Sequence, residues 1–298
     1  MTKSRKQTEE NTVFVEINGN PLAVEVMGPE NAPAMIVHHG APGLGSRAEP
    51  RRSFGPFSDR LRVVVFDARG SGESGDAGPF SHAQWVADVE AIRRHFDLGR
   101  IVMAGGSYGG FIAMEYALAH PENVAALVLR DTAANTDYDH LAVERARTTD
   151  RVRIPEWVIE RIGTGHFTGN EEFREYWRAI LPLYDHTYDP EAVERRVAQT
   201  SYHYRTHNEA FGVNMPAYDL TPRLHEITCP TLVTVGRHDW RTPVPASQTI
   251  ADLVPDGELV VFEKSGHSPQ LEEPELFQQV VRDFLTRAGV LVPRAGRP

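Results

Sequence analysis

The sequence predicts an α/β fold built on a mostly parallel sheet, and two patterns carry this prediction. Short runs rich in β-branched residues recur along the 298 residues, and helical patterns lie between most of them. The middle runs are apolar throughout, as expected for parallel strands that helices cover on both faces. The alternation of strand and helix favours one sheet with right-handed crossover connections.

Eight strands are expected in this sheet. Residues 12–17 and 22–27 flank the turn sequence Asn-Gly-Asn-Pro and predict an opening hairpin. The other expected strands cover residues 34–39, 62–67, 100–105, 124–131, 231–236 and 258–263. Helices are expected at 83–96, 110–119, 244–253 and 274–287.

Residues 133–222 interrupt the alternation of strands and helices. This stretch contains no convincing strand and is rich in aromatic, charged and histidine residues. It predicts several short helices inserted between two strands as a cap. The expected organisation is therefore a core of residues 12–132 and 223–290, a helical cap at 133–222, and tails at 1–11 (disordered) and 291–298.

Composition and charge exclude several classes of protein. The formal net charge is 31 − 41 = −10 without a basic stripe, which argues against nucleic acid as a partner. No apolar run reaches the ~18 residues of a membrane span, and the polar first ten residues do not resemble a signal peptide. The single cysteine, Cys229, excludes an internal disulfide, so the expected location is the cytoplasm.

The sequence Gly105-Gly106-Ser107-Tyr108-Gly109 fits the pattern G-x-S-x-G between an expected strand and an expected helix. A serine in such a sharp turn takes strained backbone angles and leaves no room for a Cβ two residues away on either side. The turn exposes the hydroxyl at a helix N-terminus, whose free N–H groups can bind an oxyanion. Ser107 is therefore the candidate nucleophile.

A serine nucleophile needs a histidine base and an acid that orients the histidine. Asp239 follows the expected strand 231–236, and His267 follows the last expected strand. This chain order of serine, acid and histidine is the one found in enzymes with a nucleophile elbow. Asp256 is the alternative acid, although it lies further from the end of a strand.

The chain resembles proline iminopeptidases of the α/β-hydrolase fold over most of residues 12–290. The motifs that carry the resemblance are HHGAPG (38–43), DARGSGES (67–74), GGSYGG (105–110), VGRHDWRTP (235–243) and SGHSPQLEEP (265–274). The resemblance implies that Ser107 is the nucleophile, Asp239 the orienting acid and His267 the base. It also implies an oxyanion hole made by the backbone N–H groups of Tyr108 and Ala41, and a bracing role for Asp67 and Arg69.

The resemblance also bears on the substrate, a small molecule or short peptide. Asn208-Glu209 matches the position at which one branch of the family binds a free amino terminus, so Glu209 is expected to bind the substrate, as are Tyr108 and Trp240. That same branch places a second glutamate where Trp240 stands, and a tryptophan offers stacking rather than charge. Three functions therefore stay open: an aminopeptidase, an esterase, lactonase or amidase for a bulky uncharged substrate, and a binding protein without turnover.

Two further patterns are similar to a dinucleotide-binding loop and to a metal site, but each lacks a feature that such a site requires. Gly70, Gly72 and Gly75 form a G-x-G-x-x-G sequence, but Pro79 follows where a phosphate-binding helix would run. The cap histidines 186, 203 and 207, together with His225, lack the close spacing and the carboxylate or cysteine partners of a zinc site. The expected chemistry needs no metal and no cofactor.

Overall fold

A computed structural model describes residues 12–292, so the expected tail 1–11 and residues 293–298 lie outside the described residues. An eight-stranded sheet has the order β1-β2-β4-β3-β5-β6-β7-β8, in which β2 pairs antiparallel with both β1 and β4 and all other neighbouring strands pair in parallel. This confirms the predicted fold class. The strands are β1 (Thr12–Ile17), β2 (Asn20–Met27), β3 (Ala34–His38), β4 (Arg62–Phe66), β5 (Ile101–Gly106), β6 (Val124–Arg130), β7 (Thr231–Gly236) and β8 (Gly257–Phe262).

The strand sequences explain how the sheet is buried on both faces. Successive side chains of a strand point to opposite faces, so a continuous apolar run supplies two cores. In β4, Val64 and Phe66 belong to one core cluster, whereas Val63 and Val65 belong to the other. The first cluster includes side chains of α3 (His82–His95), α4 (Tyr108–Ala119) and α10 (Val244–Leu253), and the second includes side chains of α2 (Ala48–Phe54) and α12 (Pro274–Arg287).

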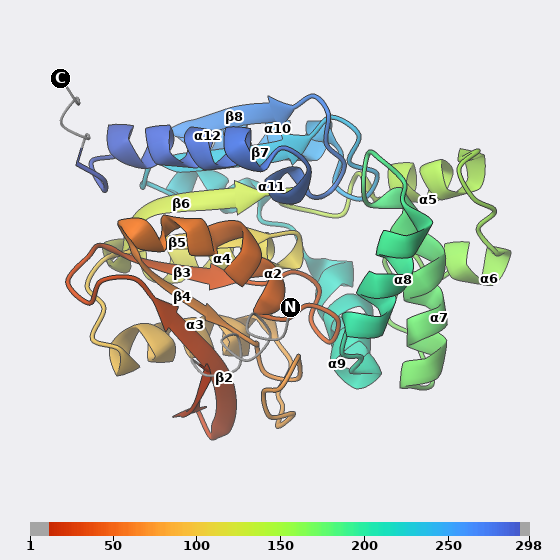
Figure 1. Ribbon diagram of the computed structural model, residues 1–298, viewed down its shortest axis with the longest axis horizontal. Helices are drawn as coiled ribbons and strands as arrows, with labels where there is room; N and C mark the ends of the chain where they lie inside the picture. Colours follow the sequence, from red (N-terminus) through yellow and green to blue (C-terminus); the bar gives the residue numbers. More distant parts are fainter. Residues whose placement is uncertain (1–11, 293–298) are drawn as a thin grey trace, which may run out of the picture.

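The described chain between β6 and β7 contains helices and no strand, and we call this group the cap. It lies beside the sheet, at the end toward which β3 and β6 point (Figure 1). Its aromatic and aliphatic residues form a third core cluster that also includes Trp240 of the β7–α10 loop. The cap helices are α5 (Asp139–Thr148), α6 (Glu156–Ile159), α7 (Asn170–Ile180), α8 (Pro190–Gln199) and α9 (Tyr204–Asn208), followed by a π-helix at Glu209–Asn214.

Three details of the fold differ from the sequence prediction or go beyond it. Helix α2 was not expected, because its seven residues are short and contain Pro50 near the N-terminal end. Leu291, the first residue of the expected C-terminal tail, is buried in the second core cluster. A four-residue helix, α11 (Pro269–Glu272), follows the His267 loop.

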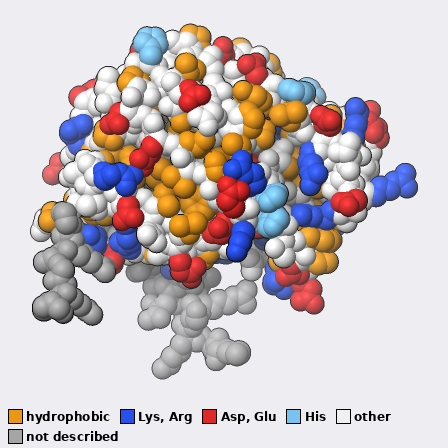
Figure 2. All heavy atoms as spheres, turned by 90° about the horizontal axis from the view of Figure 1, so that it is seen from above, with side chains coloured by type: hydrophobic (Ala, Val, Ile, Leu, Met, Phe, Trp, Pro, Cys, Tyr) orange, Lys and Arg blue, Asp and Glu red, His pale blue; other side chains and the backbone are white. Residues whose placement is uncertain are grey.

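The face that carries β8, α10 and α12 shows hydrophobic side chains among scattered charges of both signs (Figure 2). On this face β8 is an edge strand, and its residues from Gly257 to Val261 are only half-buried. Among the described residues, no helix combines the length and the apolar character that crossing a bilayer requires.

Candidate active site

Ser107 stands at the junction of β5 and α4 with a backbone conformation that L-residues rarely adopt. Its φ is +53° and its ψ is −125°. Three backbone-directed hydrogen bonds hold the residue there. Its N–H donates to Arg130 O at 2.8 Å, and its carbonyl accepts from Gly110 N–H at 2.9 Å and from Thr132 Oγ1 at 2.8 Å. The serine side chain is thereby presented at the N-terminus of α4.

The glycines around Ser107 permit the close approach of three backbone segments. A Cβ on Gly105 would lie 2.1 Å from Gly109 O, and a Cβ on Gly109 would lie 2.4 Å from His38 O. Because these are backbone atoms, they cannot rotate away as a flexible side chain could. The structure thus supports the prediction that side chains do not fit two residues before and after the serine.

His267 and Asp239 form a buried pair. His267 Nδ1 lies 2.8 Å from Asp239 Oδ2, and the two residues are 6% and 5% exposed. Asp239 accepts three further hydrogen bonds, from the N–H groups of Arg241 (2.8 Å) and Thr242 (3.1 Å) and from Thr242 Oγ1 (2.8 Å). Burial works against the charge of Asp239, but the adjacent His267 and the Thr242 donors lower its pKa below the ordinary value.

The structure therefore brings together two of the three residues proposed for the triad, and Ser107 lines the same cleft as His267. Asp256 is not the partner of His267. Its carbonyl instead accepts the N–H of Thr231 in the turn before β8. Tyr108 and Ala41, expected to form the oxyanion hole, both line the pocket beside Ser107.

A third buried acid lies beside this pair, and the sequence analysis did not identify it. Asp131 follows the last residue of β6, is fully buried and has a positive φ of 47°. One carboxylate oxygen each of Asp131 and Asp239 and one ring nitrogen of His267 lie within 4.8 Å of one another. Burial, together with the negative charge of Asp239, raises the pKa of Asp131 well above its ordinary value.

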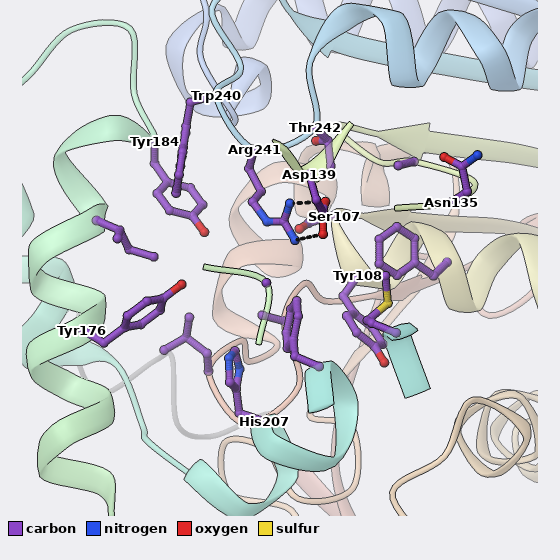
Figure 3. A pocket seen from close by; sticks show the side chains of 18 residues that line it. Ser107, Tyr108, Asn135, Asp139, Tyr176, Tyr184, His207, Trp240, Arg241 and Thr242 are labelled. Carbon is purple, nitrogen blue, oxygen red and sulfur yellow. Dashed lines mark hydrogen bonds and ion pairs between the residues drawn. The ribbon is translucent and has the colours of Figure 1, made fainter. Parts of the chain in front are cut away.

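Ser107 lies between two hollows, which we call the inner pocket and the outer cleft. The inner pocket, of about 40 Å³, lies between the nucleophile elbow and the cap (Figure 3). The outer cleft, of about 210 Å³, is lined by Ser107 and His267 and also by charged side chains. Those charged residues are Glu49, Arg52, Arg130 and Arg196.

Aromatic and aliphatic side chains dominate the inner pocket, and Asp139 is the one acidic residue among those that line it in the described chain. Arg241 donates to Asp139 Oδ1 at 2.5 Å and to Oδ2 at 3.3 Å, as the dashed lines in Figure 3 show. Burial lowers the pKa of His207 to about 3, so its ring is neutral. Its Nδ1 is buried and has no hydrogen-bond partner among the described residues.

The three residues expected to bind substrate are placed differently. Tyr108 and Trp240 line the inner pocket, and Trp240 packs edge-on against Tyr184 with ring centroids 5.4 Å apart. Glu209 does not line it: the residue is exposed and borders a shallow surface hollow with Pro79 and Phe80. Glu209 therefore lies outside the pocket that Tyr108 and Trp240 line.

The loop with the G-x-G-x-x-G sequence is braced internally. Asp67 accepts the N–H of Glu73 at 2.8 Å and forms an ion pair with Arg47, and a Cβ on Gly72 would collide with the Asp67 carboxylate. Arg69 forms a buried ion pair with Asp88 at 2.6 Å. These contacts support a structural role for Asp67 and Arg69. The helix that follows the glycine loop, α3, begins only at His82.

Comparisons with known proteins identify relatives of this chain. The sequence profile of the α/β hydrolase fold matches residues 33–274. The proline iminopeptidase PfmaB of Pestalotiopsis fici is 33% identical over 279 residues, which cover 92% of this chain and 99% of the relative. A proline iminopeptidase of Heyndrickxia coagulans is 27% identical, with 91% and 97% covered.

Solved structures show the same fold at lower sequence identity. The enol-lactonase of Burkholderia xenovorans superposes with a TM-score of 0.73 at 22% identity, with 92% of this chain and 100% of that chain covered. A thermophilic esterase of Thermogutta terrifontis has a TM-score of 0.71 at 26% identity, with 93% and 98% covered.

Proposed function

Because this chain belongs to the proline iminopeptidase-like family of α/β-fold hydrolases, we propose that it is a serine aminopeptidase that releases N-terminal residues from short peptides through an acyl-enzyme. The observation that carries the proposal is the buried His267–Asp239 pair in the cleft that Ser107 also lines.

The proposed reaction uses His267 as the base and then as the acid. The imidazole accepts the proton of Ser107 Oγ while the oxygen attacks the scissile carbonyl carbon, and Asp239 holds the resulting imidazolium. The backbone N–H groups of Tyr108 and Ala41 stabilise the oxyanion. His267 then protonates the leaving amine as the C–N bond breaks, and water attacks the ester by the same steps in reverse.

We assign one part of the substrate to each of the two hollows. We place the N-terminal residue in the inner pocket, whose small volume and aromatic walls suit a small apolar side chain. The outer cleft then receives the leaving amine with the rest of the peptide. Within the inner pocket, Asp139 and the neutral His207 are the groups that can meet an ammonium ion.

A second function is favoured by one specific observation. Arg241 already neutralises the carboxylate of Asp139. Glu209 lies outside the inner pocket, and Trp240 forms part of the pocket wall. A substrate without a free amine fits such a pocket, so an esterase, lactonase or amidase is the alternative proposal.

Hydrolysis of three substrates separates the two proposals. A proline arylamide with a free amine, its N-acetyl derivative and a simple aryl ester are compared, with Ser107→Ala as the control. A strong preference for the free amine supports the aminopeptidase. Equal rates on both amides, or activity on the ester alone, support the alternative. Unchanged activity of Ser107→Ala would overturn both, because loss of the nucleophile costs about 10⁶-fold in triad enzymes.

A further inference from the structure

Two buried carboxyl groups stand behind His267, although the proposed mechanism uses only one. Asp239 follows β7, and Asp131 follows the adjacent strand β6. Their side chains meet because β6 and β7 pair in parallel and both chains turn at the same edge of the sheet. The N–H of Gly236, at the end of β7, donates to Asp131 Oδ1 at 3.0 Å and fixes this carboxyl group next to the Asp239 loop.

The hydrogen-bond donors around the two carboxyl groups decide which of them carries the charge. Asp239 accepts from four donors at 2.8–3.1 Å: two backbone N–H groups, the Thr242 hydroxyl and His267 Nδ1. Asp131 accepts one N–H at 3.0 Å and a longer contact of 3.4 Å from Arg130 Nη1. Two buried carboxylates this close repel each other strongly, so one proton is retained, and it stays on the less solvated group.

We propose that Asp131 is a positioning residue for His267, which holds a proton beside the charged Asp239 and takes over as the orienting acid when Asp239 is lost. The geometry allows this exchange. The Asp131 oxygen lies within 4.8 Å of a ring nitrogen of His267, so a movement of about 2 Å brings it to hydrogen-bond distance. The inference rests on the proposed serine chemistry but not on the choice between peptide and ester.

The groups that face the Asp131 carboxyl are Asp239, Arg130, His267 and the backbone of Gly236. Without the charge of Asp239, the repulsion that adds to the effect of burial on Asp131 disappears, while the Gly236 N–H and Arg130 contacts remain. The Asp131 proton then passes to solvent, and the Asp131 carboxylate accepts a hydrogen bond from the Nδ1–H of His267. The Nδ1 proton stays on His267, and no other bond is made or broken.

The test is a double-mutant cycle on acylation of Ser107 by a fluorophosphonate, read together with aryl ester hydrolysis. Loss of the acid from a Ser-His-Asp triad ordinarily costs about 10⁴-fold. We expect Asp239→Ala to lose only about 100-fold, Asp131→Asn to lose less than Asp239→Ala at pH 7, and the double variant to lose about 10⁴-fold. Equal rates for Asp239→Ala and the double variant would overturn the proposal.

Two further measurements separate positioning from stability. Asp88→Asn, at a buried aspartate of α3 that is paired with Arg69 and not with His267, is the control, and in the Asp239→Ala background it must not reproduce the additional 100-fold loss. If Asp239→Ala does not fold, the pH profile of Asp131→Asn decides. Wild type shows an additional change in rate at the pH where Asp131 loses its proton, above the ordinary range of an aspartate, and the variant lacks it. Identical profiles would contradict the proposal. Failure of the fluorophosphonate to label wild-type Ser107 would instead count against the proposed function.

Discussion

Substitution of Gly105 by alanine tests the tight packing of the nucleophile elbow. The added Cβ would lie 2.1 Å from Gly109 O and 2.4 Å from Gly109 C, both backbone atoms of the first turn of α4. Ordinary contact begins at 3.4 Å, so the N-terminus of α4 must move by about 1.3 Å relative to β5. That movement carries Ser107 and the N–H of Tyr108 with it.

The expected losses follow from this displacement. Overpacking against rigid backbone costs about 3 kcal/mol of unfolding free energy. With an unfolding entropy of about 2.1 cal/mol/K per residue, a chain of 298 residues loses about 5 °C in Tm. A nucleophile misplaced by about 1 Å costs on the order of 100-fold in kcat.

Thermal melting and aryl ester hydrolysis measure the two effects on the same samples. Gly99→Ala is the matched control, because a Cβ there meets nothing within 4 Å, and alanine at a compatible site is neutral or slightly stabilising. The reasoning is refuted if Gly105→Ala keeps wild-type activity and Tm. Equal losses in both variants would show that the effect does not come from the elbow.

Four other substitutions test separate parts of the structure. Glu209→Ala should change kcat/KM for a proline arylamide less than 2-fold, because Glu209 is exposed outside the inner pocket. Asp139→Asn should raise KM for the substrate with a free amine more than KM for its N-acetyl derivative. A larger effect of Glu209→Ala than of Asp139→Asn on the free amine would restore Glu209 as the amine site. Trp240→Ala should cost about 3–5 kcal/mol in urea unfolding, because the ring is 4% exposed and packs into the cap core; a loss below 1 kcal/mol would contradict this. Hydrogen bonds from Arg93, Tyr116 and Arg94 outweigh burial and lower the pKa of Glu90 to about 2. Glu90 therefore stabilises the fold above its unfolded pKa, and that stability is lost as pH falls toward 2. Urea unfolding should show Glu90→Gln less stable than wild type by up to about 3 kcal/mol at pH 7, with the difference shrinking toward pH 3; a constant difference would refute the assignment.

The strands and the elbow could be predicted because their signals are local. Continuous β-branched runs mark strands buried on both faces, and the glycines around Ser107 reflect contacts within a few residues of the serine. Helix α2 carried no such signal. It is held by the packing of Phe54 against Phe277, at a centroid distance of 5.6 Å, far away in the sequence.

The residues that line the inner pocket could not be predicted, because their positions depend on a backbone geometry that no sequence pattern indicates. From Glu209 onward the cap forms a π-helix, so the side-chain positions depart from the α-helical period. His207 lines the inner pocket and Glu209 faces solvent, although the spacing from Asn208-Glu209 to Asp239 matched the family pattern.

Asp131 was missed for a different reason. In the sequence it is 108 residues from Asp239 and ends an ordinary apolar strand. The two meet only because β7 pairs directly with β6 after the long cap insertion. Which strands pair across such an insertion is decided by the packing of the whole sheet, and no local sequence pattern indicates it.

Hydrogen bonds join the cap to the loop that carries His267. The N–H of His267 donates to Tyr184 O of the cap at 2.6 Å, and Glu272 accepts the N–H groups of both Gly266 and His186 at 2.7 Å. If the cap swings away at this corner, these bonds break and the imidazole loses its backbone support. The position of the proton-transfer group is therefore set by the cap segment Tyr184–His186 as well as by the core strand that precedes its loop.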